Sequence, residues 1–143
     1  MVEAIAAAEG AQAVAVSAKI EADLAEISPD EAALYMEEMG LREGGLGRMI
    51  RAGYALLNLI TFLTAGEPEV RAWTITKGTK APQAAGVIHS DIERGFIRAE
   101  VTAYPDLVEA GSFNAARERG ITRLEGREYV MQDGDVVYFR FNV

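Results

Sequence analysis

The sequence has no cysteine, little histidine and no long apolar run, and each shortage removes a class of function. Without cysteine, the chain has no disulfide, no thiol nucleophile and no thiolate ligand for a metal. The longest apolar stretch, residues 55–63, contains Asn58 and Thr61 and falls well short of the roughly 20 residues of a membrane-spanning helix. Glu3 and Glu9 stand where a signal peptide would be basic. We therefore expect a cytoplasmic protein with no membrane partner.

The sequence has an excess of acidic residues. The chain has 22 Asp and Glu against 14 Lys and Arg, for a net charge of −8, yet half its residues are apolar, as in a folded globular protein. Residues 1–65 carry 4 basic against 10 acidic residues, whereas residues 66–143 carry 10 against 12. This shift in composition predicts a domain boundary near the turn at residues 66–68.

The first part of the chain is predicted to be largely helical. Alanine-rich residues 2–9 favour a helix, and residues 13–16, AVAV, favour a short strand. Ile20, Leu24 and Ile27 recur with helical spacing. Residues 28–31, Ser-Pro-Asp-Glu, have the spacing of a capping box with proline at the first helical position, so a helix should run from there to about residue 39. A further apolar face at residues 46–57 predicts another helix.

After residue 59 the pattern changes to short strands. Residues 60–64 and 70–76 predict a hairpin, residues 81–89 a helix and residues 96–103 a strand. Residues 106–119 read as a helix or loop interrupted at Gly111. Residues 129–131 and 136–141 predict a second hairpin across an Asp-Gly turn. This order indicates an α+β fold in which a small mixed sheet packs on a helix.

One basic segment stands out against the acidic background. Residues 71–80 contain Arg71, Lys77 and Lys80 and no acid. A basic turn in a protein of net charge −8 suggests a polyanionic or acidic partner. Arg94 and Arg98 extend this set, although acidic residues are interleaved with them and ordinary solvated surface charge explains the pattern equally well. Binding through such residues should depend on salt and read little sequence.

Two long stretches resemble a known family. Residues 56–101, LLNLITFLTAGEPEVRAWTITKGTKAPQAAGVIHSDIERGFIRAEV, and residues 125–143, EGREYVMQDGDVVYFRFNV, closely resemble the C-terminal region of the Obg-like ATPases of the YchF subfamily of P-loop NTPases. The resemblance implies that residues 59–143 form a TGS domain, a β-grasp module like ubiquitin. It also implies a helical linker over residues 28–58.

The resemblance also implies a role for the N-terminal residues. In P-loop NTPases of this class the last strand of the nucleotide domain is followed by a short loop near the base, and Ser17-Ala18-Lys19 matches that loop. Residues 1–27 would then be the C-terminal remnant of the nucleotide-binding domain. The chain lacks the GxxxxGK[ST] motif that cradles phosphates, and glycine-rich residues 44–47 do not supply it. We therefore expect a C-terminal fragment without cofactor or hydrolysis of its own, whose full-length parent binds ATP or GTP with Mg²⁺.

The expected function is that of a binding module. The resemblance implies a ribosome or RNA–protein surface as partner, with Arg71, Lys77, Lys80 and Arg94 as contact candidates and the parent nucleotide-binding domain as a second partner. The alternative is a β-grasp protein-interaction or intramolecular scaffold that binds no nucleic acid. Helices separated from the rest of the parent protein would expose apolar surface, so a homodimer of the fragment is a further alternative.

Other chemically suggestive residues have simpler explanations. His89, Ser90 and Asp91 are adjacent in sequence, whereas catalytic groups usually converge from separate elements, so we expect a locally bonded histidine at a helix end. Asp133 and Asp135 fit a turn better than a metal site. The aromatic residues of the strands should lie mainly in the core, with one or two exposed. We predict neither catalytic nor metal-ligating residues.

Overall fold

The computed structural model describes residues 1–66 and 69–142 and divides into two units. The helical unit comprises Met1–Leu57, and the sheet unit comprises Asn58–Val143. The predicted compositional boundary at residues 66–68 falls inside the sheet unit, and residues 67–68 themselves lie outside the described residues. In the part of the chain that the structure describes, no helix has the length and apolar character needed to cross a membrane.

The helical unit contains α1 (Val2–Ala8), α2 (Ala18–Ala25), α3 (Pro29–Glu38) and α4 (Gly45–Leu56). The predicted capping box is confirmed at the start of α3. The Ser28 hydroxyl accepts a hydrogen bond from the Glu31 amide at 3.4 Å, and the Glu31 carboxylate accepts one from the Ser28 amide at 3.0 Å. These two bonds satisfy amides that have no partner inside the helix, which explains why the helix begins there.

The strand predicted over residues 13–16 is wrong. Residues 11–17 have no regular secondary structure, and α2 follows directly. A strand is stable only when a neighbouring strand pairs with its backbone groups, so β-type composition alone does not produce one. The Ser17 hydroxyl nevertheless accepts a hydrogen bond from the Ile20 amide at 3.4 Å and caps α2.

A carboxylate of α2 fixes the start of α4. The two Glu21 carboxylate oxygens accept hydrogen bonds from the Gly45 amide at 2.5 Å and the Leu46 amide at 3.3 Å. Gly45 is the one buried residue of the helical unit, and a Cβ there would lie 2.8 Å from Val16 Cγ1. Gly45 therefore permits the close approach of residues 16–21 to α4.

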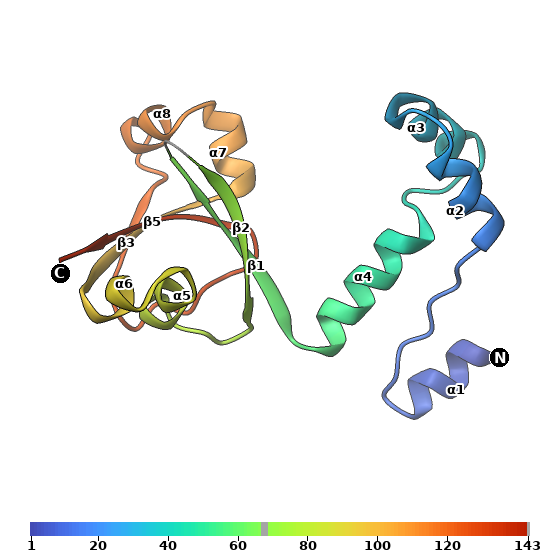
Figure 1. Ribbon diagram of the computed structural model, residues 1–143, viewed down its shortest axis with the longest axis horizontal. Coiled ribbons are helices and arrows are strands. Elements are labelled where there is room, and N and C mark those ends of the chain that lie inside the picture. Colours follow the sequence, from blue (N-terminus) through green and yellow to red (C-terminus); the bar gives the residue numbers. More distant parts are fainter. Residues whose placement is uncertain (67–68, 143) are drawn as a thin grey trace. The chain divides into compact units, whose positions relative to one another are not determined.

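The sheet unit is a five-stranded mixed sheet with helices packed on it (Figure 1). Its strands are β1 (Leu59–Ala65), β2 (Val70–Thr76), β3 (Phe96–Ala103), β4 (Arg123–Glu125) and β5 (Asp135–Phe141), and its helices are α5 (Ala81–Ile88), α6 (Ser90–Arg94), α7 (Tyr104–Ala110) and α8 (Phe113–Glu118). The strand order is β2-β1-β5-β3-β4, in which β1 and β5 are parallel and the other neighbours are antiparallel. The α+β class is thus confirmed.

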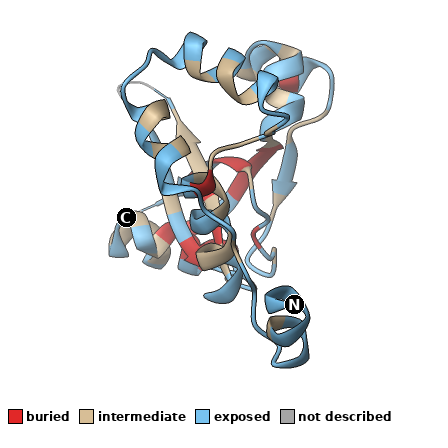
Figure 2. Ribbon diagram, turned by 90° about the vertical axis from the view of Figure 1, so that its right-hand side faces the viewer, coloured by how far each residue is buried: buried red, intermediate tan, exposed pale blue. Residues whose placement is uncertain are grey.

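The core lies between one face of the sheet and α5. Alternate residues of β1, β3 and β5 point to this face, among them Phe62, Val101 and Phe139, while Ala84 and Ala85 of α5 are fully buried. Small residues on α5 let the helix lie close to the strands. Figure 2 shows the buried residues concentrated in the sheet and the helix that covers it. The sheet unit therefore has a core of its own.

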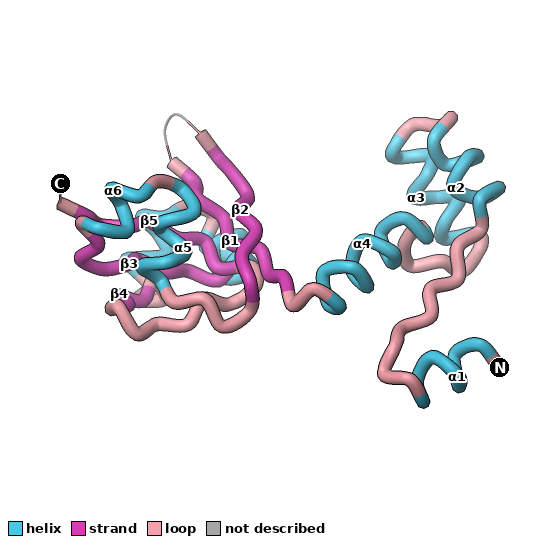
Figure 3. Tube along the Cα trace, turned by 60° about the horizontal axis from the view of Figure 1, so that its bottom comes forward, coloured by secondary structure: helices cyan, strands magenta, loops and turns pink. Residues whose placement is uncertain are grey.

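The sequence predicted one hairpin correctly and a second one wrongly. The hairpin of β1 and β2, the helix α5 and the strand β3 all form as expected, and Gly111, with φ +78°, separates α7 from α8. The predicted hairpin between residues 129–131 and 136–141 does not form. Val130 instead forms an isolated bridge with Lys80, and β5 lies between β1 and β3, as the tube in Figure 3 shows.

The Asp-Gly turn has a different role from the one predicted. The Asp133 carboxylate accepts a hydrogen bond from the Thr61 amide at 2.8 Å, and the Gly134 amide donates to the Thr61 carbonyl at 2.8 Å. Gly134 adopts φ +78°, a conformation that favours glycine. The turn is therefore tied to β1 and directs β5 into the middle of the sheet.

Candidate functional site

The two predicted contact lysines lie in the connection between β2 and α5. The Lys77 amide donates to the Asn58 carbonyl at 2.7 Å, and its ammonium group pairs with no carboxylate among the described residues. Lys80 stands just before α5, and its ammonium nitrogen lies 2.6 Å from the Glu128 carboxylate. The hydrogen bond and charge of Lys80 lower the pKa of Glu128. Lys77 is therefore the more available cation of the two.

The two predicted contact arginines lie on other elements. The Arg71 guanidinium stacks 4.1 Å from the centre of the Trp73 ring and lies 4.0 Å from the Glu69 carboxylate. Arg94 ends α6 and lies 2.5 Å from the Asp91 carboxylate. Arg71 and Lys77, the residue directly after β2, are six positions apart along the extended backbone, a distance of about 20 Å. Arg71 thus lies far from Lys77, and three of the four predicted contact residues already have an acidic neighbour.

The predicted base loop lies at the start of α2. Ser17 caps the helix, and Ala18 and Lys19 form its exposed first turn. Amides in the first turn of a helix have no partner within it, so those of Ala18 and Lys19 are available to a polar ligand. The small side chain of Ala18 leaves room for such an approach. The start of α2 therefore presents exposed amides, and contact with a base stays a prediction.

The histidine is locally bonded, as predicted. His89 Nδ1 accepts a hydrogen bond from the Asp91 amide at 3.1 Å and caps α6. The same nitrogen lies 3.6 Å from the Asp91 carboxylate, and the side chain is well exposed. Among the described residues, no three histidine, aspartate or glutamate side chains gather in a way that could hold a metal ion.

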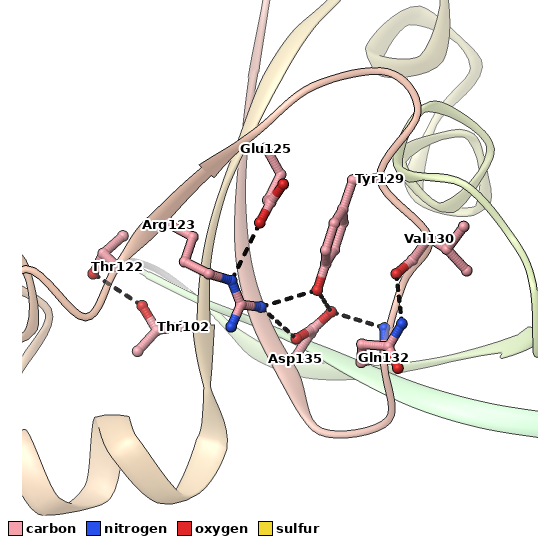
Figure 4. Close-up of polar contacts among 8 residues, drawn as sticks. All are labelled: Thr102, Thr122, Arg123, Glu125, Tyr129, Val130, Gln132 and Asp135. Atoms are coloured by element: carbon pink, nitrogen blue, oxygen red, sulfur yellow. Dashed lines mark hydrogen bonds and ion pairs between the residues drawn. The ribbon is translucent and has the colours of Figure 1, made fainter.

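A polar network that the sequence did not predict joins β4 to the start of β5 (Figure 4). The Tyr129 hydroxyl donates to the buried Asp135 carboxylate at 2.8 Å and accepts from the Arg123 guanidinium at 3.0 Å. The Gln132 amide donates to the same Asp135 oxygen at 2.9 Å. Burial and the neighbouring Asp135 raise the pKa of Tyr129 to about 12, so its proton stays in the network at neutral pH. The network fixes the segment that leads into β5.

A second cluster lies on the sheet face opposite the core. The Glu100 carboxylate accepts hydrogen bonds from Arg140 Nε at 2.8 Å and from an Arg117 Nη at 2.7 Å. Arg98 pairs with Arg140 across the strands, and Tyr138 pairs with Glu100. We call Arg98, Arg117 and Arg140, together with Glu100 and Tyr138, the arginine face. The polar residues at alternate positions, Arg98 and Glu100 in one strand and Tyr138 and Arg140 in the other, were the available signal, but the pairing of β3 with β5 was not predicted.

The aromatic side chains divide as expected between core and surface. Phe62 and Phe139 make an edge-to-face contact with ring centres 5.9 Å apart, and Phe96 packs against Phe139. Tyr138 and Phe141 are 48% and 43% exposed. Two aromatic rings of β5 are therefore available to a partner.

Comparison with known proteins places these features in a family. A family model named YchF-GTPase_C, described as a protein of unknown function (DUF933), matches residues 59–142. The chain is 57% identical over 138 residues to the ribosome-binding ATPase YchF of Bacillus subtilis, covering 96% of this chain and 38% of that protein. It is 50% identical over 133 residues to human Obg-like ATPase 1, covering 93% and 33%.

A solved structure resembles the chain over both units. The Schizosaccharomyces pombe YchF GTPase matches with a TM-score of 0.79 and 41% identity, covering 92% of this chain and 34% of that one. The chain spans less than two fifths of the length of each of these relatives. On this match of sequence and fold, the chain belongs to the YchF-GTPase_C family.

Proposed function

We propose that the chain is the C-terminal part of a nucleotide-hydrolysing protein that binds the ribosome, and that residues 59–143 act as its ribosome-contacting module. The observation that carries this proposal is the similarity, over nearly the whole chain, to proteins named ribosome-binding ATPase YchF. The mixed sheet packed on α5, with its first and last strands parallel and adjacent, supports a TGS module of the β-grasp type.

The contacts would be made by cations on the sheet unit. Lys77 is the leading candidate because its ammonium group has no carboxylate partner among the described residues. Lys80, Arg71 and Arg94 would have to exchange their contacts with Glu128, Glu69 and Asp91 for contacts with phosphate. Such an exchange is possible for exposed ion pairs because their net stabilisation is small.

The nucleotide would be held mainly by parts of a longer protein. Residues 17–19 would contact the base of ATP or GTP through exposed amides at the start of α2. The phosphates and Mg²⁺ need a GxxxxGK[ST] loop, which this sequence does not contain. Within this proposal, residues 1–27 belong to the nucleotide domain, residues 28–58 link it to the TGS module, and the protein works in the cytoplasm with the ribosome.

Co-sedimentation with ribosomal subunits over a salt series tests the proposal. We expect the chain to pellet with a subunit at low salt and to be released as salt rises, because counterions compete for the phosphates. The variant Lys77→Ala/Lys80→Ala should bind more weakly at every salt concentration. Glu128→Gln is the matched control, since it breaks the Lys80 ion pair but keeps both cations.

The remaining outcomes separate the alternatives. Binding to subunits that does not change with salt would favour a protein-interaction scaffold with apolar contacts. Failure to pellet under any condition would contradict ribosome binding by this chain. A second copy is a further possible partner because α4 exposes Leu46, Met49 and Ile50 by more than half. Sedimentation equilibrium of the chain alone would detect such a dimer.

A further inference from the structure

The arginine face is built by the pairing of β3 with β5. Arg98 lies opposite Arg140, and Glu100 lies opposite Tyr138, so these four side chains share the sheet face that does not carry the core. The register shifts between Phe96 and Arg98. This bulge lets Phe96 and Ala99 both point to the core while Arg98 is exposed on the other side. The backbone irregularity therefore directs a cation to the open face.

One buried carboxylate holds two of the arginines in place. Glu100 is 8% exposed, and burial alone would raise its pKa. The hydrogen bonds and charges of Arg140 and Arg117 outweigh burial and lower the pKa, so Glu100 is ionised at neutral pH. The Arg140 guanidinium also stacks 4.5 Å from the centre of the Tyr138 ring. The arginines are thus ordered before any ligand arrives.

The arginine face has N–H donors beyond those bonded to Glu100, and these donors can bind an anion. A guanidinium has five N–H donors, and Arg140 and Arg117 each give one hydrogen bond to Glu100. Both side chains are 47% exposed. Arg98 pairs with no carboxylate among the described residues. Three arginines against one glutamate leave a local charge of +2, although residues 66–143 together carry −2.

The form of the face favours single-stranded RNA over an acidic peptide. Arg98, Glu100, Arg117, Thr122 and Leu124 line a shallow hollow of about 310 Å³. Beside it the Tyr138 ring is 48% exposed. Guanidinium groups match phosphate oxygens in geometry, and an exposed aromatic ring provides a stacking surface for a base. An acidic peptide would use the charges but would have no need of the ring.

We propose that the arginine face binds single-stranded RNA, with Arg98, Arg117 and Arg140 holding phosphates and Tyr138 stacking on a base. This inference rests on the proposed ribosome-binding function and assigns it a surface distinct from Lys77 and Lys80. Arg98 and Tyr138 are the residues to test, because neither holds a buried carboxylate. Their removal should therefore leave the fold intact.

The test is fluorescence anisotropy of the whole chain with a labelled oligouridylate about twelve nucleotides long, over about 50–200 mM KCl. Arg98→Ala should reduce the slope of log affinity against log salt by about 0.7, the loss of one phosphate contact to a single strand. Tyr138→Ala should weaken binding about 5- to 100-fold and leave that slope unchanged, because stacking releases no counterion.

Matched controls remove the same side-chain types elsewhere. Arg42→Ala takes an exposed arginine from the helical unit, and Tyr104→Ala takes a half-exposed tyrosine from α7. Both should bind the oligonucleotide like the unaltered chain. Circular dichroism of each variant checks that the fold is kept.

Two results would overturn the inference. The first is unchanged binding of the oligouridylate by both Arg98→Ala and Tyr138→Ala. The second is that the chain binds no RNA but binds a polyglutamate peptide, and that this binding depends on Arg98 and not on Tyr138. If the chain still pellets with ribosomal subunits in either case, the proposed function stands and only the surface is wrong. If it neither pellets nor binds the oligonucleotide, both proposals fail.

Discussion

At the scale of single residues, the buried Asp135 carboxylate organises its surroundings. It is 2% exposed and accepts hydrogen bonds from the Tyr129 hydroxyl and the Gln132 amide, with Arg123 3.7 Å away. A buried carboxylate is costly unless it is paired and hydrogen-bonded. The two hydrogen-bond donors and the nearby Arg123 charge therefore stabilise the buried carboxylate together.

We expect Tyr129→Phe to lower the free energy of unfolding by about 1–2 kcal/mol at neutral pH, because Asp135 loses one donor. Urea denaturation would measure the loss. Tyr104→Phe, a change on an exposed ring, should cost far less. Equal stability of Tyr129→Phe and the unaltered chain would contradict the role assigned to the hydroxyl.

The same tyrosine should make stability depend on alkaline pH. The pKa of Tyr129 is raised to about 12 in the folded chain, against about 10 when unfolded. The unfolded chain therefore loses this proton first, and the stability that the protonated hydroxyl provides is complete below pH 10 and lost as pH rises toward 12. The difference in stability between the unaltered chain and Tyr129→Phe should shrink over that window, as denaturation at several pH values would show. A constant difference would rule out this linkage.

At the scale of elements, Gly95 allows the start of β3 and the end of β5 to meet. The Asn142 amide donates to the Gly95 carbonyl at 2.9 Å. A Cβ at Gly95 would lie 2.1 Å from the Asn142 carbonyl oxygen, a backbone atom that cannot rotate away. The glycine is required here by space and not by its backbone dihedral, since φ is −86°.

Gly95→Ala should therefore destabilise the sheet unit by about 1–3 kcal/mol, the usual cost of forcing extra atoms into a packed region. For a domain of this size, that corresponds to a fall in Tm of very roughly 4–20 °C. Gly126→Ala is the control, because a Cβ there would meet nothing within 4 Å. Thermal unfolding followed by circular dichroism compares the two, and a similar Tm for both would show that the end of β5 moves aside easily.

The elements also show why the sequence predicted some pairings and not others. The capping box at Ser28 and the hairpin of β1 and β2 depend on neighbouring residues, so local patterns were sufficient. The partners of β5 are distant in sequence, and no local pattern identifies them. Because the pairing of β3 with β5 was unknown, Glu100 could not be assigned its two arginines. Arg98 was recognised only as one of several basic residues.

At the scale of the whole molecule, the two units differ in their cores. Every buried apolar side chain among the described residues belongs to the sheet unit, whereas Gly45 is the sole buried residue of the helical unit. Apolar side chains of α4, including Leu56 at 70%, remain exposed. Helices of this length gain most of their stability from packing, so the helical unit should be the less stable one in the isolated chain.

Hydrogen exchange measured by mass spectrometry tests this difference. We expect amides of α1–α4 to exchange orders of magnitude faster than those of β1, β3 and β5, because the helices open without disrupting a buried core. A chain reduced to residues 58–143 should keep the protection of its strands. Comparable protection of α4 and β5 in the whole chain would show that the helical unit has a core or partner of its own.

The central position of β5 in the sheet affects how the sheet unit folds during translation. The last strand to be synthesised separates β1 from β3, so the β1–β2 hairpin and the β3–β4 pair have no common sheet until it arrives. A nascent chain that ends before residue 135 would carry two unjoined pieces with the apolar side chains of the future core open to water. Domains normally fold as units during translation, and pairings distant in sequence form slowly. This unit should thus stay unfolded until nearly all of the sequence up to Phe141 has emerged, which makes it dependent on protection during synthesis.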